Sequence, residues 1–446
     1  MSKQISLNQV KKYQKEFESC SDCRISMNAL TRSKLDDVTM DWGISRTIDH
    51  NYSNVVKHEM PKVTNQKGSG RCWGFAALNL MRIEFSKKYD LQGFEFSQSY
   101  FMFFDKLEKS NYFLENILST LELEFNSRLI MHLLDSPIQD GGQWDMFVNL
   151  MDKYGIVPQS VMPETVHTSM SRPMNVLITR TLRKFASILR NEYKKGASIK
   201  DLRKIKVEMM SSIYKMLCNF IGQPPTLFNW EARTKKKKFI RYENITPLDF
   251  YNKMSGINLK NKVCLIHCPM SDKEYNKLYT VKYLGNVVEG QIIQYLNVPI
   301  EELKKAAVKS IKNDEAVWFG CDVGKMFHRD LGVMIDGLYD YNSFFGVDSN
   351  MDKATKLEYG DSQMTHAMLF TGVNLVKNKP TKWRVENSWG AKSGDKGYFL
   401  MSDDWFDEYN YEVVIDKKYL SKKILSLFNQ KPIKLEPWDP MGALAR

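Results

Sequence analysis

The chain has 446 residues, of which 43% are hydrophobic and 12% aromatic, enough to build a large folded core. Charged residues make up 26%, a proportion typical of folded rather than disordered proteins. Lys and Arg outnumber Asp and Glu by 64 to 52, a net charge of +12. That excess is compatible with nucleic-acid binding, but charge alone bears on solubility and nonspecific contact more than on function.

Residues 1–60 are mostly polar and predict an N-terminal arm that begins with a helix. They contain no apolar segment of the kind found in signal peptides, and no window of the chain approaches 18 uncharged apolar residues. Seven cysteines without a signal peptide argue against a disulfide framework, so we expect a cytoplasmic protein with reduced thiols and no membrane contact. Cys20 and Cys23 form a lone CxxC pair, and without a second such pair we expect no metal or cofactor.

Residues 61–170 read as a helical lobe. Phe75, Leu78, Met81 and Phe85 recur at steps of three and four, which predicts a helix over residues 72–88. Further helices follow the serines of "EFSQSYF", either of which can cap a helix N-terminus. The Gly-Gly pair of "DSPIQDGGQW" then forms a loop before another short helix.

Residues 171–260 change character and predict an inserted helical module. Two apolar stripes at helical spacing are followed by the lysine run of "TKKKKFIRY", which is typical of a solvated surface, with phosphate binding as the alternative. Residues 261–430 alternate in the manner of strands in "VCLIHC", "EAVWFGC", "HAMLFTGV" and "YEVVID", which indicates an antiparallel sheet or barrel. The order of elements predicts an α+β protein with two lobes and a cleft between them.

Cys72 stands where a polar, glycine-containing loop meets the first of these helices. A helix N-terminus lowers the pKa of a thiol, and thiolate is the nucleophilic form. Gly68 and Gly70 let the backbone turn and approach a substrate closely. From this segment alone, a nucleophile and a small core residue are equally good interpretations.

A thiolate hydrolase also needs a base, a group that orients it and an oxyanion hole. His366 opens a strand-like run, and Asn387 follows 21 residues later in "WRVENSWG". His328 is a weaker competitor for the base. Taken alone, His366 would more often be a structural residue.

The combination of Gln-x5-Cys-Trp, His-Ala at a strand start and Asn-Ser-Trp-Gly closely resembles the papain-like cysteine peptidases. The resemblance implies that Cys72 is the nucleophile, His366 the general base and Asn387 the residue that orients the imidazole. It also implies an oxyanion hole formed by the Gln66 side chain and the Cys72 backbone N–H. Trp389 would shield the His–Asn hydrogen bond.

The spacing points to one branch of that superfamily. His366 lies 294 residues after Cys72, against about 130–150 in simple papain-like enzymes, so the module at 171–260 reads as an insertion. With Arg71 before the nucleophile, and with blocks such as "DGGQWDMF", "VWFGCDVGK" and "PWDPMGALAR", the chain is similar to the bleomycin hydrolase or aminopeptidase C branch. That branch implies a barrel-like homohexamer with an internal cavity.

The last segment, residues 431–446, has the composition of a frayed terminus. The resemblance implies instead that this arm lies in the active-site cleft, where its carboxylate would hold the substrate's amino group. Ala445 and Arg446 would then bind substrate, together with Gly141, Gly142 and Trp389. Because a terminal cation would repel that amino group, we expect Arg446 to be removed by the enzyme itself.

Two other functions are compatible with the sequence. An endopeptidase would differ only in leaving the cleft free of the C-terminal arm. A nucleic-acid-binding protein with a degenerate peptidase fold would account for the charge, although all the catalytic positions being filled argues against degeneracy. The favoured interpretation, implied by the resemblance, is a cytosolic cysteine aminopeptidase of broad specificity that removes N-terminal residues from peptides, with bleomycin-like amides as further candidate substrates. Weak polyanion binding is a side property that salt would suppress.

Overall fold

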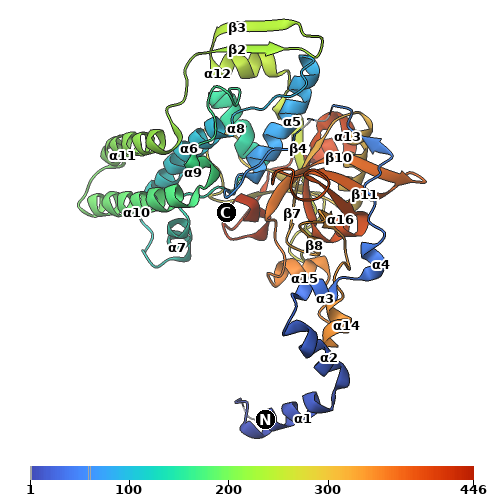
Figure 1. The fold of residues 1–446 in the computed structure, drawn as a ribbon. Coiled ribbons are helices and arrows are strands. Elements are labelled where there is room, and N and C mark those ends of the chain that lie inside the picture. The colour runs from blue at the N-terminus through green and yellow to red at the C-terminus, as the bar shows by residue number, and fades with distance from the viewer. Residues whose placement is uncertain (1–2, 59, 61, 446) are drawn as a thin grey trace.

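The computed structural model describes residues 3–58, 60 and 62–445. Helices dominate the first half of the chain and strands the second, so the structure is α+β, as expected. Figure 1 shows the helices of the first half grouped beside a twisted sheet, with the N-terminal arm extending away from both.

The elements of the first half are α1 (Leu7–Ser19), α2 (Ser21–Leu30), α3 (Leu35–Thr39), α4 (Trp42–Ser45), β1 (Asn54–Val55), α5 (Cys72–Lys88), α6 (Gln98–Ser119), α7 (Arg128–Asp135), α8 (Trp144–Tyr154), α9 (Val166–Ser169), α10 (Arg172–Lys194), α11 (Ile199–Ile221), β2 (Phe228–Arg233), β3 (Phe239–Ile245), α12 (Pro247–Asp249), η1 (Phe250–Ser255) and η2 (Leu259–Asn261).

The elements of the second half are β4 (Lys262–Ile266), β5 (Lys277–Val281), β6 (Tyr295–Asn297), α13 (Ile300–Lys312), β7 (Val317–Cys321), β8 (Phe327–His328), β9 (Val333–Met334), α14 (Tyr341–Phe345), α15 (Lys353–Glu358), β10 (His366–Val376), β11 (Lys379–Glu386), β12 (Tyr398–Ser402), α16 (Asp403–Tyr409), β13 (Asn410–Asp416), η3 (Lys417–Tyr419), α17 (Lys422–Leu427), β14 (Ile433–Leu435) and η4 (Pro440–Ala445).

Helix α5 is the central helix and has the bounds that the apolar spacing predicts. It buries fourteen of its seventeen residues, because the sheet, α6 and α8 pack around it. The next helix, α6, begins after Ser97, whose hydroxyl accepts the backbone N–H of Tyr100 at 3.0 Å. Ser97 is therefore the N-cap, one of the two serines that the sequence offered.

The inserted region is only partly helical. Its two apolar stripes form α10 and α11, as predicted, but residues 228–245 fold into the antiparallel hairpin β2–β3. The prediction of a wholly helical module is wrong at this point, because Trp230 packs inward on α5 aromatics such as Phe85. The lysines at 235–238 occupy the hairpin turn and are exposed, as expected of a solvated surface.

The second half forms a twelve-stranded sheet in the order β14-β5-β6-β4-β13-β7-β10-β11-β12-β9-β8, with β1 paired to β10. Its central strands, from β4 to β12, are antiparallel, in agreement with the prediction. The pairs β14–β5, β4–β6 and β12–β9 are parallel, so the prediction of an antiparallel sheet is wrong toward the edges. One face of the central strands packs on the helices of the first half, and the other packs on α13 and α16.

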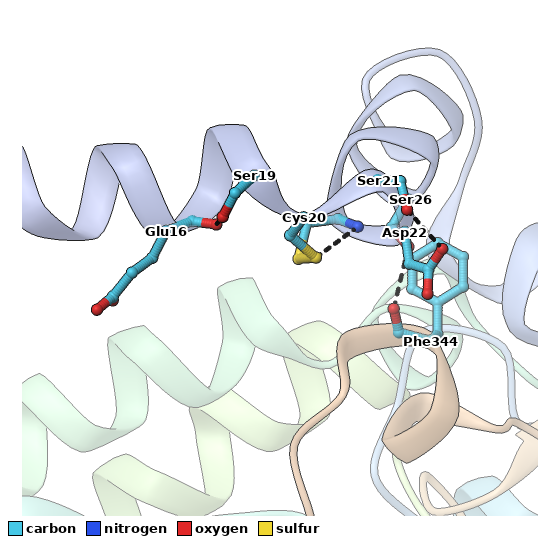
Figure 2. The surroundings of a disulfide bond; sticks show 8 residues. Glu16, Ser19, Cys20, Ser21, Asp22, Ser26 and Phe344 are labelled. Atoms are coloured by element: carbon cyan, nitrogen blue, oxygen red, sulfur yellow. Dashed lines mark hydrogen bonds between the residues drawn. A yellow bond between two sulfur atoms is a disulfide. The ribbon is translucent and has the colours of Figure 1, made fainter.

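The N-terminal arm carries a disulfide between Cys20 and Cys23 at the junction of α1 and α2. The expectation that all thiols are reduced is therefore wrong here, because the turn between the two helices brings the sulfur atoms together. Figure 2 shows this junction beside α14, where the Ser26 hydroxyl donates to the Phe344 carbonyl at 3.0 Å. The division of the chain into segments 1–60, 61–170, 171–260, 261–430 and 431–446 stays a prediction.

A buried ion pair joins the central helix to the sheet. Arg82 of α5 donates to the carboxylate of Glu386 at the end of β11 at 2.5 Å, and the two side chains are 2% and 1% exposed. A buried pair of this kind contributes little net stability, but removal of one partner leaves an uncompensated charge.

We expect Arg82→Met to lower the free energy of unfolding by about 3–5 kcal/mol, because the Glu386 carboxylate would then be buried alone. The midpoint of urea denaturation measures this effect. Arg82→Met combined with Glu386→Leu should recover much of the loss. As a control, Lys204→Met removes an exposed ion pair with Asp201 and should leave the midpoint nearly unchanged. An equal loss in the single and double variants would contradict this interpretation.

Candidate active site

Cys72 is the first residue of α5, and its thiol lies at the boundary between the helices and the sheet. The sulfur accepts hydrogen bonds from the backbone N–H groups of Cys72, Trp73 and Ala367. The thiol is nevertheless 4% exposed, and burial raises its pKa to about 11. The expectation that the helix N-terminus lowers this pKa below its ordinary value is wrong, because desolvation of the thiolate outweighs the three N–H groups.

His366 is brought to the same place by β10. It is the first residue of that strand and directly precedes Ala367, whose N–H contacts the Cys72 sulfur. Its Nε2 lies 2.9 Å from Oδ1 of Asn387, just past the end of β11. Because the Asn387 oxygen can only accept, Nε2 carries the proton and Nδ1 is left as an acceptor. Burial lowers the pKa of His366 to about 4.

The indole of Trp389 covers the histidine. The two ring centroids are 4.9 Å apart, with 37° between the ring planes. His366 and Asn387 are 5% and 1% exposed, so their hydrogen bond is shielded from water. The alternative base, His328, lies in β8 and accepts the Leu331 N–H at 3.3 Å through Nδ1, a contact within its own turn.

Gln66 is held from both of its ends. Its Oε1 accepts the Ser388 hydroxyl and its Nε2 donates to the Ser69 carbonyl, each at 2.6 Å. The Gln66 backbone N–H also donates to the Ser388 carbonyl at 2.8 Å. A primary amide has two N–H groups, so one remains for another acceptor. Ser388, which the sequence interpretation missed, thus fixes the rotamer of Gln66.

Residue 142 has to be glycine for the loop to lie against Trp73, the residue after Cys72. A Cβ at this position would lie 2.3 Å from Cε2 of the indole. The adjacent Gly141 carbonyl accepts Nζ of Lys109 at 2.5 Å. The pair Gly141–Gly142 therefore forms a fixed loop against Trp73, and its role in substrate binding stays a prediction.

The C-terminal arm lies along this loop. Gly142 N–H donates to the Leu444 carbonyl at 3.1 Å, and the Gln139 side chain donates to the carbonyl of Ala445. Both Leu444 and Ala445 are buried, so the segment is not frayed. Residues 440–445 form the 3₁₀ turn η4, although their composition did not predict helical structure. Arg446 lies outside the described residues.

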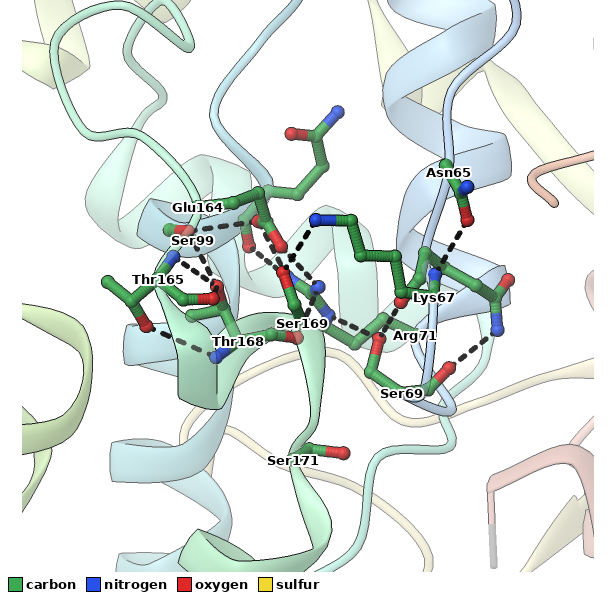
Figure 3. Close-up of polar contacts among 12 residues, drawn as sticks. Asn65, Lys67, Ser69, Arg71, Ser99, Glu164, Thr165, Thr168, Ser169 and Ser171 are labelled. Atoms are coloured by element: carbon green, nitrogen blue, oxygen red, sulfur yellow. Dashed lines mark hydrogen bonds and ion pairs between the residues drawn. The ribbon is translucent and has the colours of Figure 1, made fainter. Parts of the chain in front are cut away.

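Arg71, the residue before Cys72, is fixed by a buried polar cluster (Figure 3). Its guanidinium makes two bonds to the Glu164 carboxylate, at 3.0 and 2.6 Å, and a third to the Thr168 carbonyl at 2.6 Å. Burial alone would raise the pKa of Glu164, but the bonds from Arg71, Ser99 and Thr168 hold it below its ordinary value. This cluster anchors the start of α5 to the segment around α9.

Asp140 holds the loop before Cys72 together with the loop of Gly141 and Gly142. The sequence interpretation missed this residue as well. Its carboxylate accepts the Gly70 N–H at 2.9 Å and Nζ of Lys106 at 2.6 Å, and its carbonyl accepts the Trp73 indole N–H at 2.6 Å. Ser171 and Asn175 at the start of α10 bind the same carboxylate. Burial would raise the pKa of Asp140, but Lys106 and these donors hold it well below its usual range. The only signal in the sequence was an acid directly before Gly-Gly.

Within the described residues, no three His, Cys, Asp or Glu side chains gather as a metal ion would require. In the same part of the chain, no helix is both long enough and apolar enough to cross a membrane.

Comparisons with known proteins agree with this geometry. The model of the Peptidase C1-like family matches residues 4–442. Aminopeptidase C of Listeria monocytogenes is 44% identical over 445 residues, covering all of both chains, and bleomycin hydrolase of Homo sapiens is 44% identical, covering 94% of each. The crystal structure of PepW from Lactobacillus rhamnosis superimposes with a TM-score of 0.97 at 42% identity, covering 99% of each chain. The chain belongs to the Peptidase C1-like family and has the papain-like fold.

Proposed function

We propose that this protein is a cysteine aminopeptidase that removes N-terminal residues from peptides with broad specificity, and that it also hydrolyses bleomycin-like amides. The proposal is supported most by three contacts: the His366–Asn387 hydrogen bond, the Ala367 N–H at the Cys72 sulfur, and the hydrogen bond of the buried C-terminal arm to Gly142, which packs on Trp73. The names of the relatives, aminopeptidase C and bleomycin hydrolase, support the same activity.

In the proposed reaction the Cys72 sulfur attacks the carbonyl carbon of the first peptide bond, and the thiol proton passes to Nδ1 of His366. Burial opposes a charge on either group alone, so the thiolate and imidazolium form together by transfer within the pair. Oδ1 of Asn387 accepts the hydrogen bond from Nε2–H throughout and so holds the imidazole ring in place. The imidazolium then protonates the leaving amine, and water hydrolyses the resulting thioester with His366 as base.

Two N–H groups would stabilise the tetrahedral intermediate. The developing oxyanion accepts one hydrogen bond from the Cys72 backbone N–H and one from the second N–H of Gln66. Because Ser388 and Ser69 already hold the Gln66 amide, no rearrangement is needed when the oxyanion forms. Trp389, packed on His366, would keep water from the imidazole.

The C-terminal arm would make this enzyme an exopeptidase. Gly142 and Gln139 bind the carbonyls of Leu444 and Ala445, so the arm takes the groove beside the nucleophile that a longer substrate would enter. We infer that the enzyme removes Arg446 and that the carboxylate of Ala445 then pairs with the ammonium of the substrate. A free N-terminus would be favoured, and a blocked one would lose the ion pair.

We further propose a cytoplasmic homohexamer. Helix α1 has no buried residue and exposes Val10, Tyr13 and Phe17 along one side, which supports contact with another subunit. Weak polyanion binding through the exposed turn at 235–238 remains a secondary proposal, and binding to an oligonucleotide should fall steeply with salt.

We expect Cys72→Ala to lower kcat on alanyl-aminomethylcoumarin by on the order of 10⁴-fold or more, because the nucleophile is removed. His366→Ala should be nearly as damaging, and Asn387→Ala milder, since the thiol and imidazole remain. The matched control is Cys218→Ala, a half-buried cysteine outside this site, which should keep full activity. Substantial turnover by pure Cys72→Ala protein would exclude the thiol mechanism.

The acid limb of kcat/KM should lie near pH 4, well below the ordinary histidine value of about 6.5. Below this pH the Cys72–His366 pair gains a proton, and the imidazole can no longer accept one from the thiol. Activity should therefore persist at pH 5 and be lost as the pH falls further, as measured by initial rates with a neutral N-terminal residue. An acid limb at 6.5 would show that His366 is hydrated in the active enzyme.

Deletion of residues 443–446 should raise activity on N-blocked peptides and lower it on free-amine substrates, since the groove opens and the ion pair is lost. Deletion of Arg446 alone is the matched control and should retain the preference for free amines. Intact mass spectrometry should show loss of one arginine in active protein and none in Cys72→Ala. A truncated enzyme that still requires a free N-terminus would contradict this role of the arm, whereas an endopeptidase would cleave blocked peptides even at full length.

A further inference from the structure

A hollow of about 630 Å³ opens between the nucleophile's loop and the inserted helix α10. The loop contributes Gly68 and Gly70, and Asp140 forms part of the floor. The wall formed by α10 includes Arg172, Arg180 and Arg183. Of the described residues, neither Gly142 nor those of the C-terminal arm line this hollow.

The hollow lies beside the loop that leads into Cys72, so in the proposed reaction the substrate's first residue would approach it. Gly70 precedes Cys72 by two residues, and a Cβ at Gly70 would be 3.0 Å from Cβ of Asp140. The two loops thus meet there, one leading to the nucleophile and the other to Gly142 and the arm. If the arm lies on one side of the substrate's first residue, the side chain of that residue faces Gly68 and Gly70 on the other side. Neither glycine has a side chain that would fill the space.

Among the residues that the structure describes, the arginines of this wall have no carboxylate partner. Arg183 donates there to two backbone carbonyls, those of Leu134 at 2.8 Å and Asp135 at 2.7 Å. Within the described residues, no carboxylate pairs with Arg172 or Arg180. By contrast, Arg203 on the neighbouring helix α11 pairs with Glu115 at 2.9 Å. The α10 wall therefore presents guanidinium groups that are available to a ligand.

Asp140 does not cancel this charge. Its carboxylate is 10% exposed and pairs with Nζ of Lys106 at 2.6 Å, while Ser171 and Asn175 also donate to it. The negative charge of Asp140 is thus buried and balanced by Lys106. A carboxylate ligand in the hollow would therefore meet positively charged arginines. Arginine binds carboxylates well because it can donate two parallel hydrogen bonds.

We propose that this hollow receives the side chain of the substrate's first residue and that its arginines favour acidic side chains, aspartate and glutamate. The inference rests on the proposed aminopeptidase activity and adds a substrate class to it. An acidic first residue would be held at its ammonium by the arm and at its side chain by Arg172 or Arg180.

The test compares glutamyl- and glutaminyl-aminomethylcoumarin, which match in shape and differ in charge. Each of Arg172→Gln and Arg180→Gln should lower the ratio of kcat/KM for glutamyl over glutaminyl substrate by roughly fivefold, the effect of one partly exposed charge pair. In the wild type, the ratio should also fall as NaCl rises from 20 to 500 mM, since salt screens exposed charges.

Lys184→Gln is the matched control, because it removes one positive charge from an exposed position of α10 that does not line the hollow. It should leave the ratio unchanged. An equal fall in this control would show that the whole field of the helix acts, and the site would be overturned. An unchanged ratio in both arginine variants would overturn it too.

Two results separate this inference from the proposed function. If glutaminyl substrate is cleaved only when N-blocked, or not at all, the aminopeptidase proposal fails before the ratio is considered. If cleavage is normal but Arg172→Gln and Arg180→Gln change the ratio for Ala-Glu over Ala-Gln peptides instead, the hollow serves the second residue. That outcome would overturn the placement proposed here.

Discussion

The site depends on one contact that joins helix α5 in the first half of the fold to the end of strand β11 in the second half. Arg82 of α5 binds Glu386, and the next residue along the chain is Asn387. Ten residues separate Cys72 from Arg82, roughly 15 Å of helix at 1.5 Å per residue. The ion pair therefore fixes the position of α5 relative to β11, and with it the distance between Cys72 and Asn387. The bond from Gln66 to Ser388 fixes the same junction at its other end.

Burial decides the electrostatics of this junction. Taken separately, the Cys72 thiol and the His366 imidazole are both pushed toward their neutral forms, to pKa values of about 11 and about 4. Such a pair holds one proton over a wide pH range, and transferring it internally creates two opposite charges that stabilise each other. The helix N-terminus and the Ala367 N–H then serve to offset part of the cost of the thiolate. In the proposed reaction, activation of the thiol therefore comes from the pair as a unit rather than from a preformed anion.

Much of this could be predicted from the sequence where local signals are strong. The bounds of α5 and the four strand-like runs named above follow from apolar periodicity, and the residues gathered at the site follow from three short motifs. Hairpin β2–β3 could not be predicted, because its pairing depends on Trp230 packing against distant aromatics. The pKa of Cys72 could not be predicted either, since burial depends on the sheet that covers the helix. Asp140 and Ser388 act through partners tens to hundreds of residues away, which no local pattern records.

The predicted insertion, residues 171–260, contributes contacts to the site that its sequence does not indicate. In the sequence it only explains why His366 lies 294 residues from Cys72. In the structure, Ser171 and Asn175 at the start of α10 bind the carboxylate that also holds the Gly70 N–H. The inserted helix is thereby tied to the loop that leads into the nucleophile. A change in α10 can reach Cys72 through Asp140 and two backbone residues, so the insertion is in a position to shape both the substrate hollow and the geometry of attack.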